Sequence, residues 1–336
     1  MGYFTKPDNY EEMAERYGRG IAPELPREVW QGRISRCQRK LEERGLDALL
    51  IYTNGNYVGG QEWARYFTNW VGGGPLWHDE VYIIIPAKGE PTWVMNWPQF
   101  VEIAREGSPM QDMRLYRGTG EGTLSTRWAA LPPLLQGLFK EKGLAGSKVG
   151  FAHGGAQGSW GDITPHLAYK AIQEGCDNVF LVEASDLLFD LIMVKTDYDI
   201  RMMRQTCDLL EDALMSAIDA CGDGVREYEV ALAYYRTAWE GGSEAACRSH
   251  MHFNFRHPSC GGGNRPFEST TYKLKKGDMF YLDVAVRYQG YVGDTSRTVV
   301  IGEPSKEQRQ VFECQPADAP GDGRCPQARR RHGQSV

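Results

Sequence analysis

The chain has 336 residues, of which 41% are hydrophobic and 24% are charged. This length and composition exclude a peptide or a wholly disordered chain, and they are typical of a globular protein of about two domains. The 44 acidic and 38 basic residues give a net charge of −6. The chain as a whole therefore has no positive field that would favour nucleic acid as its partner.

Sequence features that mark membrane, secreted and metal-thiolate proteins are missing from the chain. The densest apolar run, 81–85, ends at Pro86 and is far shorter than the roughly 18 residues of a membrane-spanning helix. The N-terminus, MGYFTKPDNYEEM, lacks the basic and then apolar order of a secretory signal. The eight cysteines are widely spaced without a CxxC pair, so we expect reduced thiols. These features predict a soluble, cytoplasmic protein with no membrane partner.

The first half of the chain carries the periodicity of a mixed α/β domain. Residues 1–25 are polar and interrupted by proline, and we interpret them as an N-terminal arm. Residues 26–186 contain apolar residues at helical spacing and short buried strands. We expect helices within 29–44 and 125–140, and strands at 48–52, 81–85, 92–95, 148–152 and 179–182. The pair 81–85 and 92–95 is predicted to form a hairpin.

A second domain is predicted over residues 187–312. Thr196, with Asp199 three residues later, is typical of a helix start. Apolar residues then recur at spacings of three and four, which predicts a buried helix face formed by Ile200, Met203, Cys207, Leu210, Leu214, Ala217 and Cys221. Because the Met and Cys residues follow this spacing, we interpret them as core residues and not as a redox or cofactor site. Another amphipathic helix is expected over 227–240.

The composition changes abruptly after Phe312. Ser305 and Gln308 form a capping box that predicts a helix, SKEQRQVFE. Residues 313–336 contain no aromatic residue and no Leu, Ile or Met, so they cannot build a core. Two interpretations stay open: a natural disordered tail, and a segment out of frame or misjoined.

Two aspartates lie in a segment that is predicted to form a hairpin, 275–302. A tight turn at Gln289-Gly290 would place Asp283 opposite Ser296 and Asp294 opposite Ala285. The two carboxylates would then share one face of the sheet as diagonal neighbours, roughly 7 Å apart at the backbone. Such a pair can hold a hard divalent cation, although two solvated acids on an exposed face explain the spacing equally simply.

The same segment resembles the metal-binding strands of the pita-bread metallopeptidase family, which includes creatinase, aminopeptidase P, prolidase and methionine aminopeptidase. The matching residues are Lys276-Gly277-Asp278, Asp283 and the run Asp294-Thr295-Ser296-Arg297-Thr298. Upstream, Met193-Val194-Lys195-Thr196 and the helix that follows resemble the entry into the family's catalytic domain. The resemblance implies a fold with a creatinase-type N-terminal α/β domain and a partial pita-bread catalytic domain.

The resemblance also implies a site. Asp283 and Asp294 would be the first two ligands of a pair of divalent ions (Mn, Zn, Co or Fe), with Asp294 bridging, and the metals would activate a water for amide hydrolysis. The family's other ligands are one His and two Glu beyond the second Asp. Here the sequence offers Glu303, Glu307, Glu313 and His332, none at the family's spacing, so the metal site is incomplete as written.

The family's substrate-facing His would fall at Arg265 or Pro266. His257 is a candidate by proximity only, and His250 and His252 are interpreted as structural histidines. No residue points to an organic cofactor.

Three functions remain open from the sequence. The first is a metal-dependent hydrolase similar to Xaa-Pro aminopeptidases and dipeptidases, homodimeric by resemblance, that acts on a small peptide or amide and is inactive as written. The second is a creatinase-like amidinohydrolase or a lyase that acts on a small polar substrate. The third is a metal-free pseudoenzyme. Measuring bound metal would separate the first two from the third.

Overall fold

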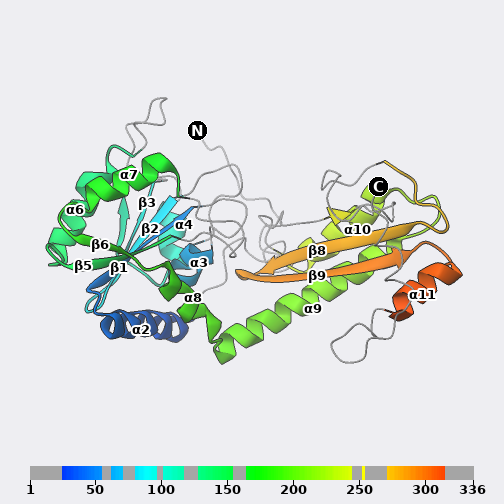
Figure 1. The fold of residues 1–336 in the computed structure, drawn as a ribbon, viewed down its shortest axis with the longest axis horizontal. Coiled ribbons are helices and arrows are strands. Elements are labelled where there is room, and N and C mark those ends of the chain that lie inside the picture. Colours follow the sequence, from blue (N-terminus) through cyan, green and yellow to red (C-terminus); the bar gives the residue numbers. More distant parts are fainter. Residues whose placement is uncertain are drawn as a thin grey trace, which may run out of the picture. The chain divides into compact units, whose positions relative to one another are not determined.

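The computed structural model describes residues 25–54, 62–70, 80–96, 101–116, 128–153, 164–243, 252–253 and 271–314. Its elements belong to two compact units (Figure 1). The first unit contains the described residues of Met1–Thr206 and Gly241–Ser249, together with the hairpin tip Arg287–Val292. The second contains those of Cys207–Glu240, His250–Val286 and Gly293–Val336. The predicted arm, apart from Leu25, and the tail beyond Cys314 lie outside the described residues.

A six-stranded mixed sheet forms the centre of the first unit, in the order β4-β3-β2-β1-β5-β6. Strand β1 pairs antiparallel with β2, and β2 pairs antiparallel with β3. The pairs β1–β5, β5–β6 and β3–β4 are parallel. The strands are β1 (Ala48–Asn54), β2 (Glu80–Pro86), β3 (Thr92–Met95), β4 (Met113–Leu115), β5 (Lys148–His153) and β6 (Phe180–Glu183). The predicted strands and the hairpin are therefore confirmed.

Helices cover both faces of this sheet (Figure 1). Leu49 and Ile51 of β1 pack toward α2 (Arg27–Arg44), α3 (Glu62–Thr68) and α8 (Ser185–Met193). Leu50 and Tyr52 pack toward α6 (Leu131–Glu141) and α7 (His166–Gly175). A further helix is α4 (Val101–Gly107). Because both faces are buried, β1 is a continuous apolar run without polar alternation. The prediction of a mixed α/β domain is confirmed.

The second unit is built from long helices and a small sheet. Helix α9 (Asp197–Ala220) enters it from the first unit and is followed by α10 (Glu227–Glu240). The sheet has the order β7-β8-β9, with β7 (His252–Phe253), β8 (Met279–Tyr288) and β9 (Tyr291–Val300). Helix α11 (Lys306–Cys314) begins with the predicted capping box. The backbone N–H of Gln308 donates to Ser305 Oγ at 3.2 Å, and the backbone N–H of Ser305 donates to Gln308 Oε1 at 2.8 Å. Among the described helices, none has both the length and the apolar character that a membrane crossing requires.

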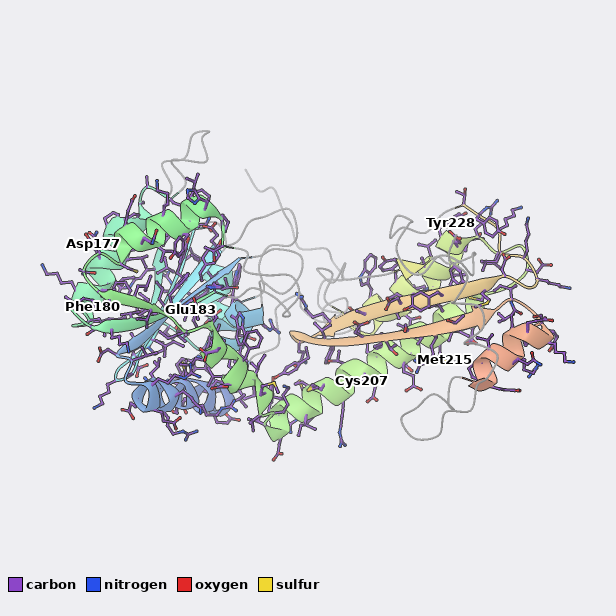
Figure 2. The ribbon with its side chains drawn as sticks, viewed as in Figure 1. Asp177, Phe180, Glu183, Cys207, Met215 and Tyr228 are labelled. Carbon is purple, nitrogen blue, oxygen red and sulfur yellow. The ribbon has the colours of Figure 1, made fainter. Side chains whose placement is uncertain are left out.

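The buried face of α9 differs from the predicted one. Ile200, Met203 and Cys207 are exposed, and Cys207 is labelled on α9 in Figure 2 with the exposed Met215. The buried residues of this stretch include Asp199, Met202, Thr206, Leu209 and Ala213. The prediction for the first three residues was wrong because two polar residues occupy the buried face: Asp199 is paired there, and Thr206 donates its hydroxyl to the Met202 carbonyl at 2.8 Å.

A buried carboxylate lies at the start of β2, surrounded by aromatic donors. Glu80 is only 2% exposed. It accepts hydrogen bonds from Trp128 Nε1 at 2.6 Å, Tyr116 Oη at 2.8 Å and Tyr82 Oη at 3.1 Å. Burial, followed by the charge of Glu80, raises the pKa of Tyr82 well above its usual value, so this phenol stays protonated as a donor. The aromatic donors therefore satisfy much of the carboxylate's hydrogen-bonding capacity.

We expect Glu80→Gln to lower the free energy of unfolding of the first unit by about 2–3 kcal/mol, because the amide replaces an acceptor oxygen with a donor that faces other donors. Tyr82→Phe is the matched control, since it removes one donor and leaves the carboxylate; it should cost about 1 kcal/mol. Urea unfolding followed by circular dichroism measures both. Equal stability of Glu80→Gln and wild type would contradict the assigned role.

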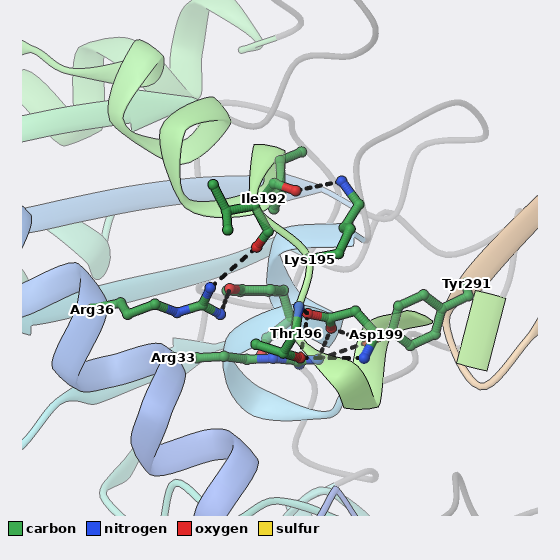
Figure 3. Close-up of polar contacts among 9 residues, drawn as sticks. Arg33, Arg36, Ile192, Lys195, Thr196, Asp199 and Tyr291 are labelled. Carbon is green, nitrogen blue, oxygen red and sulfur yellow. Dashed lines mark hydrogen bonds and ion pairs between the residues drawn. The ribbon is translucent and has the colours of Figure 1, made fainter. Parts of the chain in front are cut away.

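A second buried charge joins α2, the start of α9 and the hairpin tip, all within the first unit (Figure 3). Arg33, 4% exposed, donates from Nη2 to Asp199 Oδ1 at 3.1 Å and to Tyr291 Oη at 2.8 Å. Tyr291 Oη donates to the same Asp199 oxygen at 2.5 Å. Asp199 Oδ2 accepts from the backbone N and hydroxyl of Thr196 at 2.8 and 2.6 Å. Both oxygens of the carboxylate are therefore occupied.

Asp199 holds its charge in spite of this burial. Burial by itself raises its pKa, but the hydrogen bonds from Thr196 and Tyr291 and the charge of Arg33 together outweigh that effect. The pKa of the Asp199 carboxyl consequently lies below its usual value. A carboxyl group with a lowered pKa stabilises the fold above its unfolded-state pKa, and this contribution is lost as the pH falls through the folded-state pKa.

Asp199→Asn should lower the free energy of unfolding by about 3 kcal/mol at pH 7, because it leaves the Arg33 charge buried without its counter-ion. The difference from wild type should shrink once the pH falls below about 4, the usual range of an unfolded Asp. Asp197→Asn, an exposed position in the same helical turn, should change stability by less than about 0.5 kcal/mol. Urea unfolding at pH 7 and pH 3 checks this, and a pH-independent difference would refute it.

Candidate functional site

The hairpin that carries both predicted aspartates turns in two residues. Strand β8 ends at Tyr288 and β9 begins at Tyr291, with φ of 51° at Gln289 and 83° at Gly290. Two consecutive positive φ values are typical of the type I′ turn, whose twist matches that of a hairpin. A side chain at Gly290 would also place its Cβ 2.5 Å from Arg65 Cγ. The predicted turn is therefore confirmed, and only glycine fits its second position.

The burial of alternate residues shows which face each aspartate occupies. In β8, Leu282, Val284 and Val286 are buried on one face, and Asp283 lies on the other, half-buried. A two-residue loop pairs Tyr288 with Tyr291, and counting from this pair puts Asp294 on the same face as Asp283. Asp294 is exposed, in agreement with that count. The geometry thus supports a shared face for the two carboxylates, while their role as metal ligands stays a prediction.

The donor set on this face does not complete a metal centre. Two carboxylates suit a hard divalent cation, but such ions take at least four ligands. In the described part of the chain, no three His, Cys, Asp or Glu side chains come close enough together to hold a metal ion. The pair Asp283 and Asp294 provides two of the five ligands that the resemblance implies, and the described residues bring no third His, Cys, Asp or Glu to them in such a cluster.

The histidine predictions fall largely outside the described residues. His257, the candidate catalytic residue, lies outside them, and so does His250. Of His252 the structure describes the backbone, which lies opposite Asp283 in the β7–β8 register. The catalytic role of His257 stays a prediction.

Sequence reasoning missed the cluster that holds the hairpin tip. Thr196 and Asp199 were recognisable as a helix start, but the partners of Asp199 lie 166 and 92 residues away. No local pattern connects Arg33 or Tyr291 to that helix. Its only sequence signal was an acidic residue in the first helical turn, which is common in helices without tertiary partners.

Two family models match successive parts of the chain. The Creatinase/Prolidase N-terminal domain matches residues 33–193, and Metallopeptidase family M24 matches residues 201–315. The first range contains the six-stranded sheet and the second contains the candidate hairpin.

Individual relatives agree with these models. The chain is 25% identical over 155 residues to an Xaa-Pro dipeptidase of Pyrococcus horikoshii, covering 45% of this chain and 43% of that protein. It is 28% identical over 129 residues to an Xaa-Pro dipeptidase of Pyrococcus furiosus, covering 38% and 36%. These matches span less than half the length of the two curated relatives.

A solved structure extends the likeness of the fold. The structure of an Xaa-Pro dipeptidase from Bacillus anthracis superposes with a TM-score of 0.63 at 19% identity, covering 86% of this chain and 70% of that one. This confirms the predicted fold class, a creatinase-type N-terminal domain followed by pita-bread elements. The two family models, which together match residues 33–193 and 201–315, show that the chain belongs to the pita-bread metallopeptidase family M24.

Proposed function

We propose that this chain carries the N-terminal domain and the first metal-ligating strands of a hydrolase of the Xaa-Pro dipeptidase and aminopeptidase type, with a small peptide or amide as its substrate. The observation that carries the proposal is the pair Asp283 and Asp294, placed on one face of a hairpin whose two-residue turn sets the register. The names of the Pyrococcus relatives support the substrate class.

The roles of the individual residues follow from their positions. Asp283 and Asp294 supply anionic oxygens that can hold a divalent ion (Mn, Zn, Co or Fe), which would supply Lewis-acid chemistry to an amide carbonyl. Gln289 and Gly290 keep the two strands in register. Tyr291, held by Asp199 and Arg33, fixes the first residue of β9. The chain's own residues thus position carboxylates, and in the described part no third His, Cys, Asp or Glu joins them in a cluster that could hold a metal ion.

Because the candidate ligands that follow Asp294 in the sequence, Glu303, Glu307, Glu313 and His332, do not have the family's spacing, we further propose that the 336-residue polypeptide by itself holds metal weakly and has little peptidase activity. This observation also favours the metal-free pseudoenzyme as the second candidate. A homodimeric state and a cytoplasmic location remain predictions. The free thiols of Cys37 and Cys176, both buried, are compatible with a reducing compartment.

The metal content of the purified polypeptide tests the proposal. After incubation with Mn²⁺, Co²⁺ or Zn²⁺ and desalting, we expect less than two equivalents by elemental analysis, and slow or undetectable cleavage of an Xaa-Pro dipeptide. Asp283→Asn and Asp294→Asn should each weaken the residual binding by about ten-fold or more, since even an outer-shell partner of a metal ligand is worth about that much.

Asp208→Asn is the matched control, because Asp208 is exposed on α9 in the same unit and its loss removes the same charge. It should leave metal binding unchanged. Tight binding of two equivalents by the wild-type polypeptide would contradict the weak-binding proposal, and residual binding insensitive to both hairpin substitutions would contradict the site itself. Hydrolysis of creatine without cleavage of the dipeptide would support the amidinohydrolase alternative instead.

A further inference from the structure

The first unit contains a cavity of about 440 Å³ that the proposed function does not use. All of its lining residues belong to this unit, and they come from four stretches of the chain: the start and first turns of α2, α3 with the residues after it, the segment from α8 to the start of α9, and the hairpin tip. This volume lies in the usual range for sites that take small organic molecules. The chemistry of the walls indicates which class of molecule fits.

One wall of the cavity is aromatic. Trp63 lies edge-on to Tyr66 at 6.2 Å and to Phe189 at 6.5 Å between ring centroids. Trp63 is buried, whereas Phe189 is 43% exposed, and Met203 nearby is 39% exposed. Large apolar side chains that line a cavity in this way favour a ligand with an aromatic or branched apolar body.

The charged groups at the cavity are mostly basic. Three cations, Arg33, Arg65 and Lys195, line it with a single carboxylate, Asp199. Both oxygens of Asp199 are occupied by Arg33, Tyr291 and Thr196, so this carboxylate neutralises Arg33 and offers nothing to a bound cation. Among the described residues, the positive charge that this site offers to a ligand therefore comes from Lys195.

Lys195 is the group best placed to meet a ligand. Its side chain is exposed, and within the described part of the chain its ammonium contacts only the Ile192 carbonyl, as Figure 3 shows. A carbonyl oxygen is a neutral acceptor and does not balance the ammonium charge. An anion at the cavity mouth would form a charge-assisted hydrogen bond there, and such bonds are roughly twice as strong as neutral ones.

We propose that this cavity binds a small organic anion, namely a carboxylate with an aromatic or branched apolar body, whose carboxylate meets Lys195 and whose body lies against Trp63 and Phe189. The site is independent of Asp283 and Asp294. A cationic ligand would be repelled by the Lys195 ammonium. A neutral analogue would leave the charge of this ammonium without a counter-ion.

The test uses 3-phenylpropionate as the probe, with 3-phenylpropionamide as its neutral counterpart, added to the full chain in EDTA so that metal plays no part. Ligand-observed NMR and calorimetry should report one site with a Kd of about 1–5 mM, the range for a ligand of this size. The amide should bind at least about five-fold more weakly, and raising the NaCl concentration from 50 to 500 mM should weaken only the carboxylate.

Lys195→Gln should weaken binding of 3-phenylpropionate by about three- to five-fold and leave the amide unaffected. Lys88→Gln, an exposed lysine on the β2–β3 turn, is the charge-matched control and should change neither affinity. Met203→Trp, which fills the cavity from an exposed position, should abolish binding of both probes. Absence of binding at 20 mM, equal affinity for the two probes, or insensitivity to Lys195→Gln would each overturn the proposal. Because no metal is present, none of these results depends on the proposed hydrolase activity.

Discussion

The candidate site depends on the two-residue turn at Gln289 and Gly290. In a hairpin, a slip of one residue moves every side chain of a strand to the opposite face, so the turn decides whether Asp283 and Asp294 meet at all. A positive φ at Gln289 is unfavourable for a residue with a side chain, by roughly 1 kcal/mol. Tyr291, two residues further along, offsets this cost, because Asp199 and Arg33 hold its phenol at 2.5 and 2.8 Å.

The described part of the first unit contains two buried carboxylates, and each is stabilised in a different way. Glu80 is surrounded by phenol and indole donors, whereas Asp199 is paired with a guanidinium and hydrogen-bonded by a helix cap. Removing one partner from either group would leave a buried polar atom unsatisfied, which costs more than an ordinary hydrogen bond contributes. The Asp199 cluster therefore makes the arrangement of α2, the start of α9 and the hairpin tip specific, beyond what apolar packing alone provides.

Local patterns in the sequence were sufficient for most elements and insufficient for the tertiary polar contacts. The apolar run of β1, the capping box at Ser305 and the glycine turn each depend on neighbouring residues, and each was predictable. The later part of the buried face of α9 followed the predicted spacing, since Leu210, Leu214 and Ala217 are buried, but its first turns did not, because Asp199 is buried there against Arg33 from a distant helix. The shared face of Asp283 and Asp294 followed from counting residues around one turn. The cavity at Lys195 could not be found in this way, because its walls come from four separate stretches of the chain.

The repulsion between the carboxylates of Asp283 and Asp294 decides whether the hairpin needs a bound cation in order to fold. Two unit charges separated by about 7 Å, the usual backbone spacing of such diagonal neighbours, would repel by roughly 0.6 kcal/mol in water and about 2.4 kcal/mol near a protein surface. Asp294 is exposed and Asp283 half-buried, so the lower value is the closer one, and salt screens it further. A hairpin held by its turn and by Tyr291 can tolerate that repulsion without a cation. The fold of the hairpin is therefore compatible with a metal-free chain, and metal binding has to be decided by the number of donors around the pair.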